Sequence, residues 1–83
     1  MSVLHIVNSP DALQRCLSVY GDGDVVMLIE DGVYSALAPI SASVMVLDQD
    51  AAARGVADQV VAPLCSYADF VALTVEHHPL VSW

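Results

Sequence analysis

Positive charge is nearly absent from this chain of 83 residues. It has no lysine, and Arg15 and Arg54 are its only basic residues besides histidine, against ten aspartates and glutamates. The net charge is −8. A protein that binds DNA or RNA needs a cluster of cations to displace the counterions of the phosphate backbone. The composition therefore argues against direct nucleic-acid binding by this chain.

Long apolar runs and export signals are also missing. The longest uncharged stretch, residues 32–47, is interrupted by Pro39 and three serines, and it falls short of the ~20 apolar residues of a spanning helix. Residues 1–6 have no basic region followed by an apolar core, so they do not read as a signal peptide. We expect a cytoplasmic protein with no membrane segment, whose Cys16 and Cys65 are reduced thiols.

Apolar residues, in contrast, are abundant. They make up 57% of the chain, above the ~45–50% of typical soluble domains. A domain this small buries only roughly 60–65% of the surface of its unfolded chain, so many side chains stay outside. Because the sequence argues against a membrane segment, the excess predicts a protein partner.

Strand and helix signals alternate along what we expect to be a single domain, residues 1–83. Runs of apolar and β-branched residues predict five strands, at 3–7, 24–29, 43–47, 59–62 and 80–83. Short connections and alternating elements predict an α/β fold. We expect a small doubly wound, mostly parallel sheet of about five strands with helices on both faces, of flavodoxin-like topology.

Four helical segments are predicted between the strands. The first begins at the cap Ser9, carries an apolar stripe to Tyr20, and ends at Gly21. A turn at 30–32 leads into a short helix at 33–37, and a third helix covers 48–55. Ser66 caps the last helix, which reaches about residue 77 before Pro79 stops it.

No cofactor is expected. The chain has neither a G-x-G-x-x-G nor a G-x-x-x-x-G-K motif. The turn at 8–10 lacks glycine and the turn at 30–32 is acidic, which also disfavours a stand-alone ligand-binding module. His77 and His78 are adjacent, so on a helix they point about 100° apart and do not chelate one metal ion. His5 is expected to be a hydrogen-bonded core or interface residue.

The two thiols differ in their expected chemistry. Cys65 lies just before the cap of the last helix, where the helix dipole lowers a thiol pKa, so local chemistry favours Cys65 as the reactive cysteine. Cys16 falls on the apolar stripe of the first helix, where a small buried side chain is the default. A persulfide carrier needs an accessible thiolate, which Cys16 provides only if its helix lines a subunit interface.

The order of several short motifs resembles the TusB/DsrH family over nearly the whole chain. These motifs are Leu4-His5, Asn8-Ser9-Pro10, Glu30-Asp31-Gly32-Val33-Tyr34, Ala53-Arg54-Gly55, Tyr67-Ala68-Asp69-Phe70-Val71, Leu73-Thr74 and the final Trp83.

The resemblance implies a subunit of a heterohexameric sulfur-relay complex that passes persulfide sulfur toward 2-thiolation of the tRNA wobble uridine. The implied partners are TusC/DsrF-like and TusD/DsrE-like subunits in a 2:2:2 hexamer, with a downstream sulfur-acceptor protein. The principal sulfur-carrying cysteine is implied to belong to the TusD/DsrE-type subunit, which leaves this chain an accessory role.

An alternative follows from the same resemblance. DsrH-type members carry a cysteine in the first helix, and Cys16 falls at that position, whereas Cys65 falls where an aliphatic residue is expected. In that alternative the chain is a DsrH-type subunit in dissimilatory sulfur oxidation and Cys16 carries the sulfur.

Overall fold

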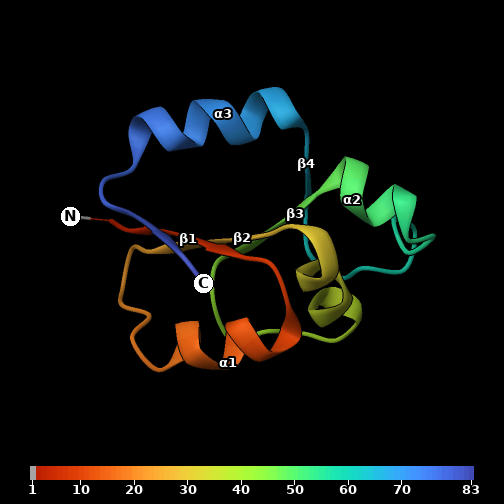
Figure 1. Cartoon of the computed structure of the whole chain (residues 1–83), viewed down its shortest axis with the longest axis horizontal. Helices are drawn as coiled ribbons and strands as arrows, with labels where there is room; N and C mark the ends of the chain where they lie inside the picture. The colour runs from red at the N-terminus through yellow and green to blue at the C-terminus, as the bar shows by residue number, and fades with distance from the viewer. Residues whose placement is uncertain (1) are drawn as a thin grey trace.

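The computed structural model describes residues 2–83 and contains one five-stranded sheet (Figure 1). Its strands are β1 (Leu4–Val7), β2 (Val25–Leu28), β3 (Val44–Leu47), β4 (Leu64–Cys65) and β5 (Leu80–Ser82). All neighbouring strands are parallel, in the order β4-β3-β2-β1-β5. The predicted α/β class is confirmed. Flavodoxin itself has the order 2-1-3-4-5, and this chain differs because β5 returns across the sheet to pair with β1.

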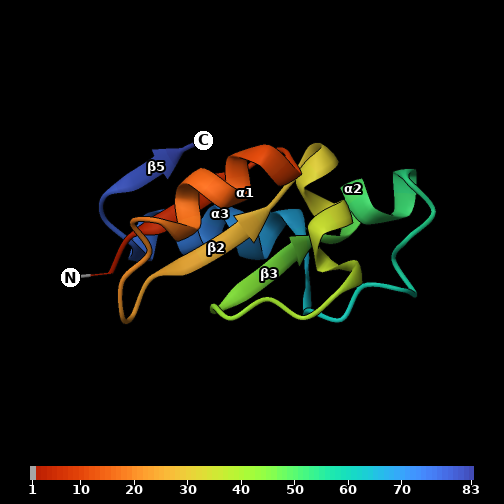
Figure 2. The ribbon, with the colours of Figure 1, turned by 90° about the horizontal axis from the view of Figure 1, so that it is seen from below.

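Helices cover both faces of the sheet. Helix α1 (Pro10–Leu17) and the 3₁₀ helix η1 (Glu30–Leu37) lie on one face, and α3 (Tyr67–Glu76) lies alone on the other (Figures 1 and 2). The short helix α2 (Asp48–Ala53) continues directly from β3 beyond the edge of the sheet. Among residues 2–83, no helix is long and apolar enough to cross a membrane.

Side chains of the central strands alternate between two cores. Val26 and Leu28 of β2 pack in the larger core beneath α1 and η1, whereas Met27 packs in a smaller core beneath α3. The uninterrupted apolar run of this strand predicted cover on both faces. The two cores are unequal, because no residue of α3 is itself buried.

The first helix is shorter than predicted. It begins at the predicted cap, where the Ser9 hydroxyl accepts a hydrogen bond from the Ala12 N–H at 3.1 Å. It ends at Leu17 with Ser18 as its C-cap, so the prediction of Gly21 as the cap is wrong. The physical reason is the loop that follows: the Tyr20 hydroxyl donates to the Asp24 carbonyl, and the Gly21 N–H donates to the Asp24 carboxylate.

The predicted fourth strand at 59–62 is also wrong. The N–H groups of Gln59 and Val60 donate to the Val56 carbonyl, and the Val61 N–H donates to the Ala36 carbonyl of η1. These hydrogen bonds form turns and link this segment to η1. Residues 59–62 therefore do not pair with β3. Pairing with β3 begins only at Pro63, whose carbonyl accepts the Val46 N–H, and gives the two-residue strand β4.

The other helical predictions hold with shifted ends. Gly55 has φ +70°, as a glycine just beyond α2 requires, and the Ser66 hydroxyl caps α3 by accepting the Asp69 N–H. The predicted turn at 30–32 is instead the start of η1. Gly32 lies so close to β1 that an added Cβ would overlap the Val7 carbonyl oxygen.

This close approach predicts the effect of Gly32→Ala. The new methyl group would meet a backbone atom of β1, which is paired on both sides and does not move without disturbing the sheet. We expect a loss of about 1–3 kcal/mol in the free energy of unfolding, despite the higher helix propensity of alanine. The measurement is urea denaturation, with Gly21→Ala as the control, because there the nearest atom to the added Cβ is 3.8 Å away. Equal midpoints for the two variants would contradict the packing argument.

Candidate functional site

Acidic side chains gather beyond the carboxyl ends of β2 and β3, the edge at which parallel sheets usually bind ligands. Glu30 and Asp31 open η1 after β2, and Asp48 and Asp50 lie in the first turn of α2 after β3. Carboxylates are favoured in these positions by the helix dipoles. The edge therefore presents negative charge and disfavours phosphate groups.

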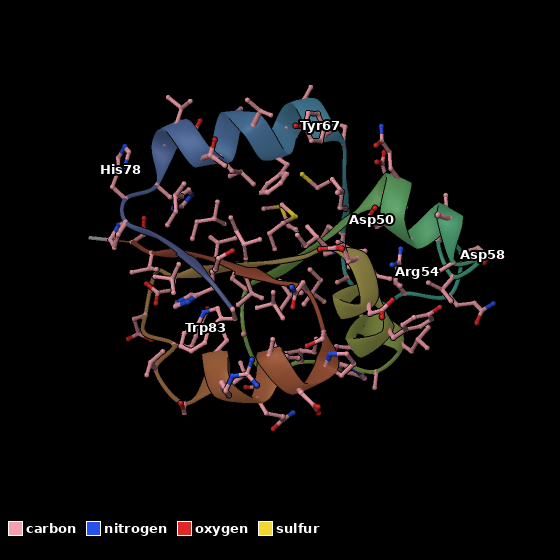
Figure 3. All side chains as sticks on the ribbon, viewed as in Figure 1. Asp50, Arg54, Asp58, Tyr67, His78 and Trp83 are labelled. Carbon is pink, nitrogen blue, oxygen red and sulfur yellow. The ribbon has the colours of Figure 1, made fainter. Side chains whose placement is uncertain are left out.

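Arg54 ties the two acidic segments together. Its Nε donates to the Asp31 carboxylate at 2.9 Å, and its Nη1 donates to the Asp50 carbonyl at 3.3 Å. The Asp50 carboxylate in turn accepts the Glu30 N–H at 2.6 Å. Figure 3 shows Asp50 and Arg54 at this end of the molecule. The hydrogen bond with Asp31 raises the pKa of Arg54, so the guanidinium stays charged and serves as a link between η1 and α2.

Asp48 differs from its neighbours because its Oδ1 atom is buried and has no hydrogen-bond partner among the described residues. The side chain lines a shallow hollow of about 340 Å³ with Ser66 and Tyr67. Within residues 2–83, no three His, Cys, Asp or Glu side chains are placed to hold a metal ion. One buried carboxylate oxygen is thus the sole unusual feature of this hollow.

The two adjacent histidines lie far from the acidic edge. The His77 Nδ1 atom is 2.9 Å from the Ser2 hydroxyl, which ties the end of α3 to the start of β1. His78 is exposed at the opposite end of the molecule from Arg54 (Figure 3). The structure therefore does not bring the histidines and the acidic residues together.

Cys16 is completely buried on α1. It lies in the larger core, with Val7, Leu13 and Val26 among the members of the same cluster. Burial raises the pKa of the Cys16 thiol, and the negative charge of Asp24 raises it further. At neutral pH the isolated chain therefore holds Cys16 as a protonated thiol with no exposed surface.

Cys65 lies at the end of β4, directly before the cap Ser66, as predicted, but its chemistry is the reverse of the prediction. It is 3% exposed, and its thiol donates to the Ser66 carbonyl at 3.4 Å. Burial raises the pKa of the thiol, and the carboxylates of Asp69 and Asp48 add to the effect. The prediction of a lowered pKa is thus wrong, because desolvation and two nearby negative charges raise the pKa of this thiol.

His5 lies in a buried polar network, as predicted for a hydrogen-bonded core residue. The Trp83 indole N–H donates to His5 Nδ1 at 3.1 Å. An indole only donates, so Nδ1 is the acceptor and the neutral ring carries its proton on Nε2. That proton is donated to the Asp24 carboxylate, with Nε2 and Oδ2 2.9 Å apart. The Tyr20 ring packs 6.2 Å from the imidazole, centroid to centroid.

The partner of His5 could not be found from local sequence. Trp83 directly follows β5 and lies beneath the sheet near α1 (Figure 3). The two residues are joined only because β5 pairs with β1. Both had been singled out as motif residues, His5 near the beginning and Trp83 at the end, and the structure shows that they form one contact.

Comparison with known proteins places most of the chain in a known family. A family model described as "DsrH like protein" matches residues 8–80. The protein TusB of Enterobacter sp. strain 638 is 36% identical, over 86% of this chain and 86% of its own length. The protein TusB of Photorhabdus laumondii is 39% identical, over 74% of this chain and 76% of its own.

A solved structure supports the fold. The solution NMR structure of protein Tm0979 from Thermotoga maritima superposes with a TM-score of 0.73 and covers 93% of this chain and 94% of its own. Its sequence identity is 24%, so the likeness concerns the architecture alone.

The Asp24 carboxylate predicts a specific acid response. Hydrogen bonds from the Val3 N–H, the His5 ring and the Gly21 N–H lower the pKa of Asp24 to about 2. Since this pKa lies below the unfolded value, Asp24 stabilises the fold fully above about pH 4, and this stability is lost as the pH falls through about 2. Urea denaturation between pH 7 and pH 2 should show a flatter pH dependence for Asp24→Asn. The exposed Asp22→Asn is the control, and parallel curves for all three proteins would refute the assignment.

Both thiols should resist modification in the native chain. Because each is buried and has a raised pKa, we expect a disulfide reagent at pH 7.5 to react at least about a hundredfold more slowly than in denaturant. Cys16→Ser and Cys65→Ser variants assign the two signals. Fast reaction of either thiol in the folded chain would show that the thiol is accessible to the reagent in solution, and would contradict the prediction.

Proposed function

This chain belongs to the family of DsrH-like proteins, which includes TusB, and from that premise we propose that it is an accessory subunit of a sulfur-relay complex. The proposed complex passes persulfide sulfur toward 2-thiolation of the tRNA wobble uridine. In each step a thiolate attacks the terminal sulfur of a persulfide, the sulfur–sulfur bond breaks, and the donor leaves as a thiolate. The transfer needs an accessible thiolate at every station.

The burial of both thiols is the observation that carries the accessory role. Cys16 and Cys65 have raised pKa values and almost no exposed surface. A chain whose cysteines are protonated and covered supports the relay through contacts with other subunits. The sulfur-carrying thiol is then supplied by a partner.

Exposed apolar side chains support an assembly. Among residues 2–83, nine large hydrophobic residues are exposed by 42–71%. They are Val19, Tyr34, Leu37, Val61, Leu64, Tyr67, Val71, Val75 and Leu80. Apolar surface of this extent on a small domain is typical of a protein interface. We propose TusC/DsrF-like and TusD/DsrE-like partners in a cytoplasmic 2:2:2 hexamer, which hands sulfur to a downstream acceptor protein.

Complementation tests the accessory role. Deletion of the gene should abolish 2-thiolation of the wobble uridine, measured by mass spectrometry of digested tRNA, because the complex is incomplete. A Cys16→Ser/Cys65→Ser chain should restore thiolation, since neither thiol carries sulfur. Cys16→Ala serves as a fold control, because it keeps a small apolar side chain in the core.

Loss of thiolation in both Cys16 variants, with the hexamer intact in sedimentation, would reject the accessory role. It would favour the alternative in which Cys16 carries sulfur. An unchanged thiolation level after deletion of the gene would reject the tRNA pathway itself.

A further inference from the structure

A groove runs between α3 and the β3–β4 side of the sheet. Its volume is about 320 Å³. Met45 and Leu73 form partly buried walls, Cys65 lies at the base, and Leu64 of the edge strand is 49% exposed. The groove exists because α3 is the only helix on this face and none of its residues is buried (Figure 1).

The groove has an acidic rim. Asp69 and Glu76 line it from α3, and both residues are exposed. They are seven residues apart on one helix, which sets their backbones about 10 Å apart along its axis. Neither carboxylate has a hydrogen-bond or ion-pair partner among the described residues. An apolar depression between two unpaired negative charges is therefore open on this face.

A second copy of this chain could supply little positive charge to the acidic rim of the groove. Its two arginines are its only strong cations, and Arg54 is engaged with Asp31. Arg15 lies on α1, on the opposite face of the sheet, one turn from Asp11. A second copy would thus bring at most one free cation to two carboxylates, and a further net charge of −8. Charge complementarity excludes a second copy as the natural occupant.

We propose that this groove receives a basic segment of a partner subunit. The segment inserts one apolar side chain between α3 and Leu64, and places a lysine or arginine beside Asp69 and another beside Glu76. Two cations seven residues apart on a helix, or about three apart on a strand, match the spacing of the carboxylates. The outer apolar stripe of α3, which contains Tyr67, Val71 and Val75, continues the contact beyond the rim.

This inference rests on the proposed assembly. It adds which face of this chain meets the partner subunit and that the partner segment is positively charged. Charges at the rim of an interface act mainly on the association rate and its salt dependence, while the apolar insertion acts on the dissociation rate. The two parts of the groove therefore give separable kinetic signatures.

Charge reversal at the rim tests the proposal. The wild-type chain and its variants are captured on a sensor, and the co-purified TusC/DsrF-like and TusD/DsrE-like subunits are passed over it at low and high salt. Asp69→Lys/Glu76→Lys should weaken the equilibrium affinity about tenfold or more and flatten its salt dependence. Asp22→Lys/Asp58→Lys is the matched control, because it changes the net charge equally at exposed sites away from the groove.

A second pair of variants tests the apolar part. Ala72 of α3 also lines the groove, so Ala72→Trp fills it and should raise the dissociation rate about tenfold or more. Ala53→Trp makes the same change at an exposed site outside the groove and should leave the rate unchanged. Asp69→Asn/Glu76→Gln, which removes the charges without reversing them, reports on the rim if the lysine variant fails to fold.

The outcomes separate this inference from the proposed function. Wild-type binding of the partners together with unaffected rim and groove variants would overturn the groove as the contact, while the proposed assembly would stand. Self-association of the chain that the rim variant abolishes would also overturn it, because the occupant would be a second copy. Failure of the wild-type chain to bind either partner would overturn the proposed function and this inference with it.

Discussion

One buried carboxylate holds the amino-terminal side of the sheet together. Asp24 accepts the Val3 N–H ahead of β1, the Gly21 N–H of the loop after α1, and the Nε2 proton of His5 within β1. His5 then accepts the indole N–H of Trp83 after β5. Three segments that are distant in sequence, at residues 3–5, 21–24 and 83, are thereby joined by one chain of hydrogen bonds. Every polar group in it is paired, which is the condition for burying such groups at low cost.

The two cores on either side of the sheet differ in how many side chains they bury. The face under α1 and η1 contains most of the fully buried side chains, whereas the buried cluster under α3 consists of Leu4, Met27 and Cys65 among the described residues. The apolar surface that remains uncovered therefore lies on the face under α3, where no helix residue is buried. The same asymmetry places both the half-exposed Leu64 and the outer stripe of α3 on the face proposed to meet a partner.

The predictable part of the fold was the part determined by neighbours in sequence. Ser9 and Ser66 were identified as helix caps because a hydroxyl before a helical stripe satisfies free N–H groups. The apolar runs of β2 and β3 were visible for a similar reason. The run at 59–62 has the composition of a strand, but its Val61 N–H donates to the carbonyl of Ala36 in η1, a contact that no local pattern reveals. Gly21 was misplaced for a different reason, since its N–H donates to the side chain of Asp24 only three residues later. The candidate site also had a part that could be predicted from the local sequence and a part that could not. The position of Cys65 before a helix cap was readable, but its burial and its two carboxylate neighbours were not.

The pairing of β5 with β1 has a kinetic consequence. Leu4 pairs with Leu80, so this contact closes a loop of nearly the entire described chain, whereas β1–β2 and β2–β3 join near neighbours. The entropy of loop closure makes the β1–β5 contact the slowest to gain. Until it forms, β1 is an edge strand with unpaired backbone groups, open to pairing with another chain. The hydrogen bond from Trp83 to His5 holds β5 against β1, and so helps to cover the backbone groups of β1 that are exposed until this last strand pairs.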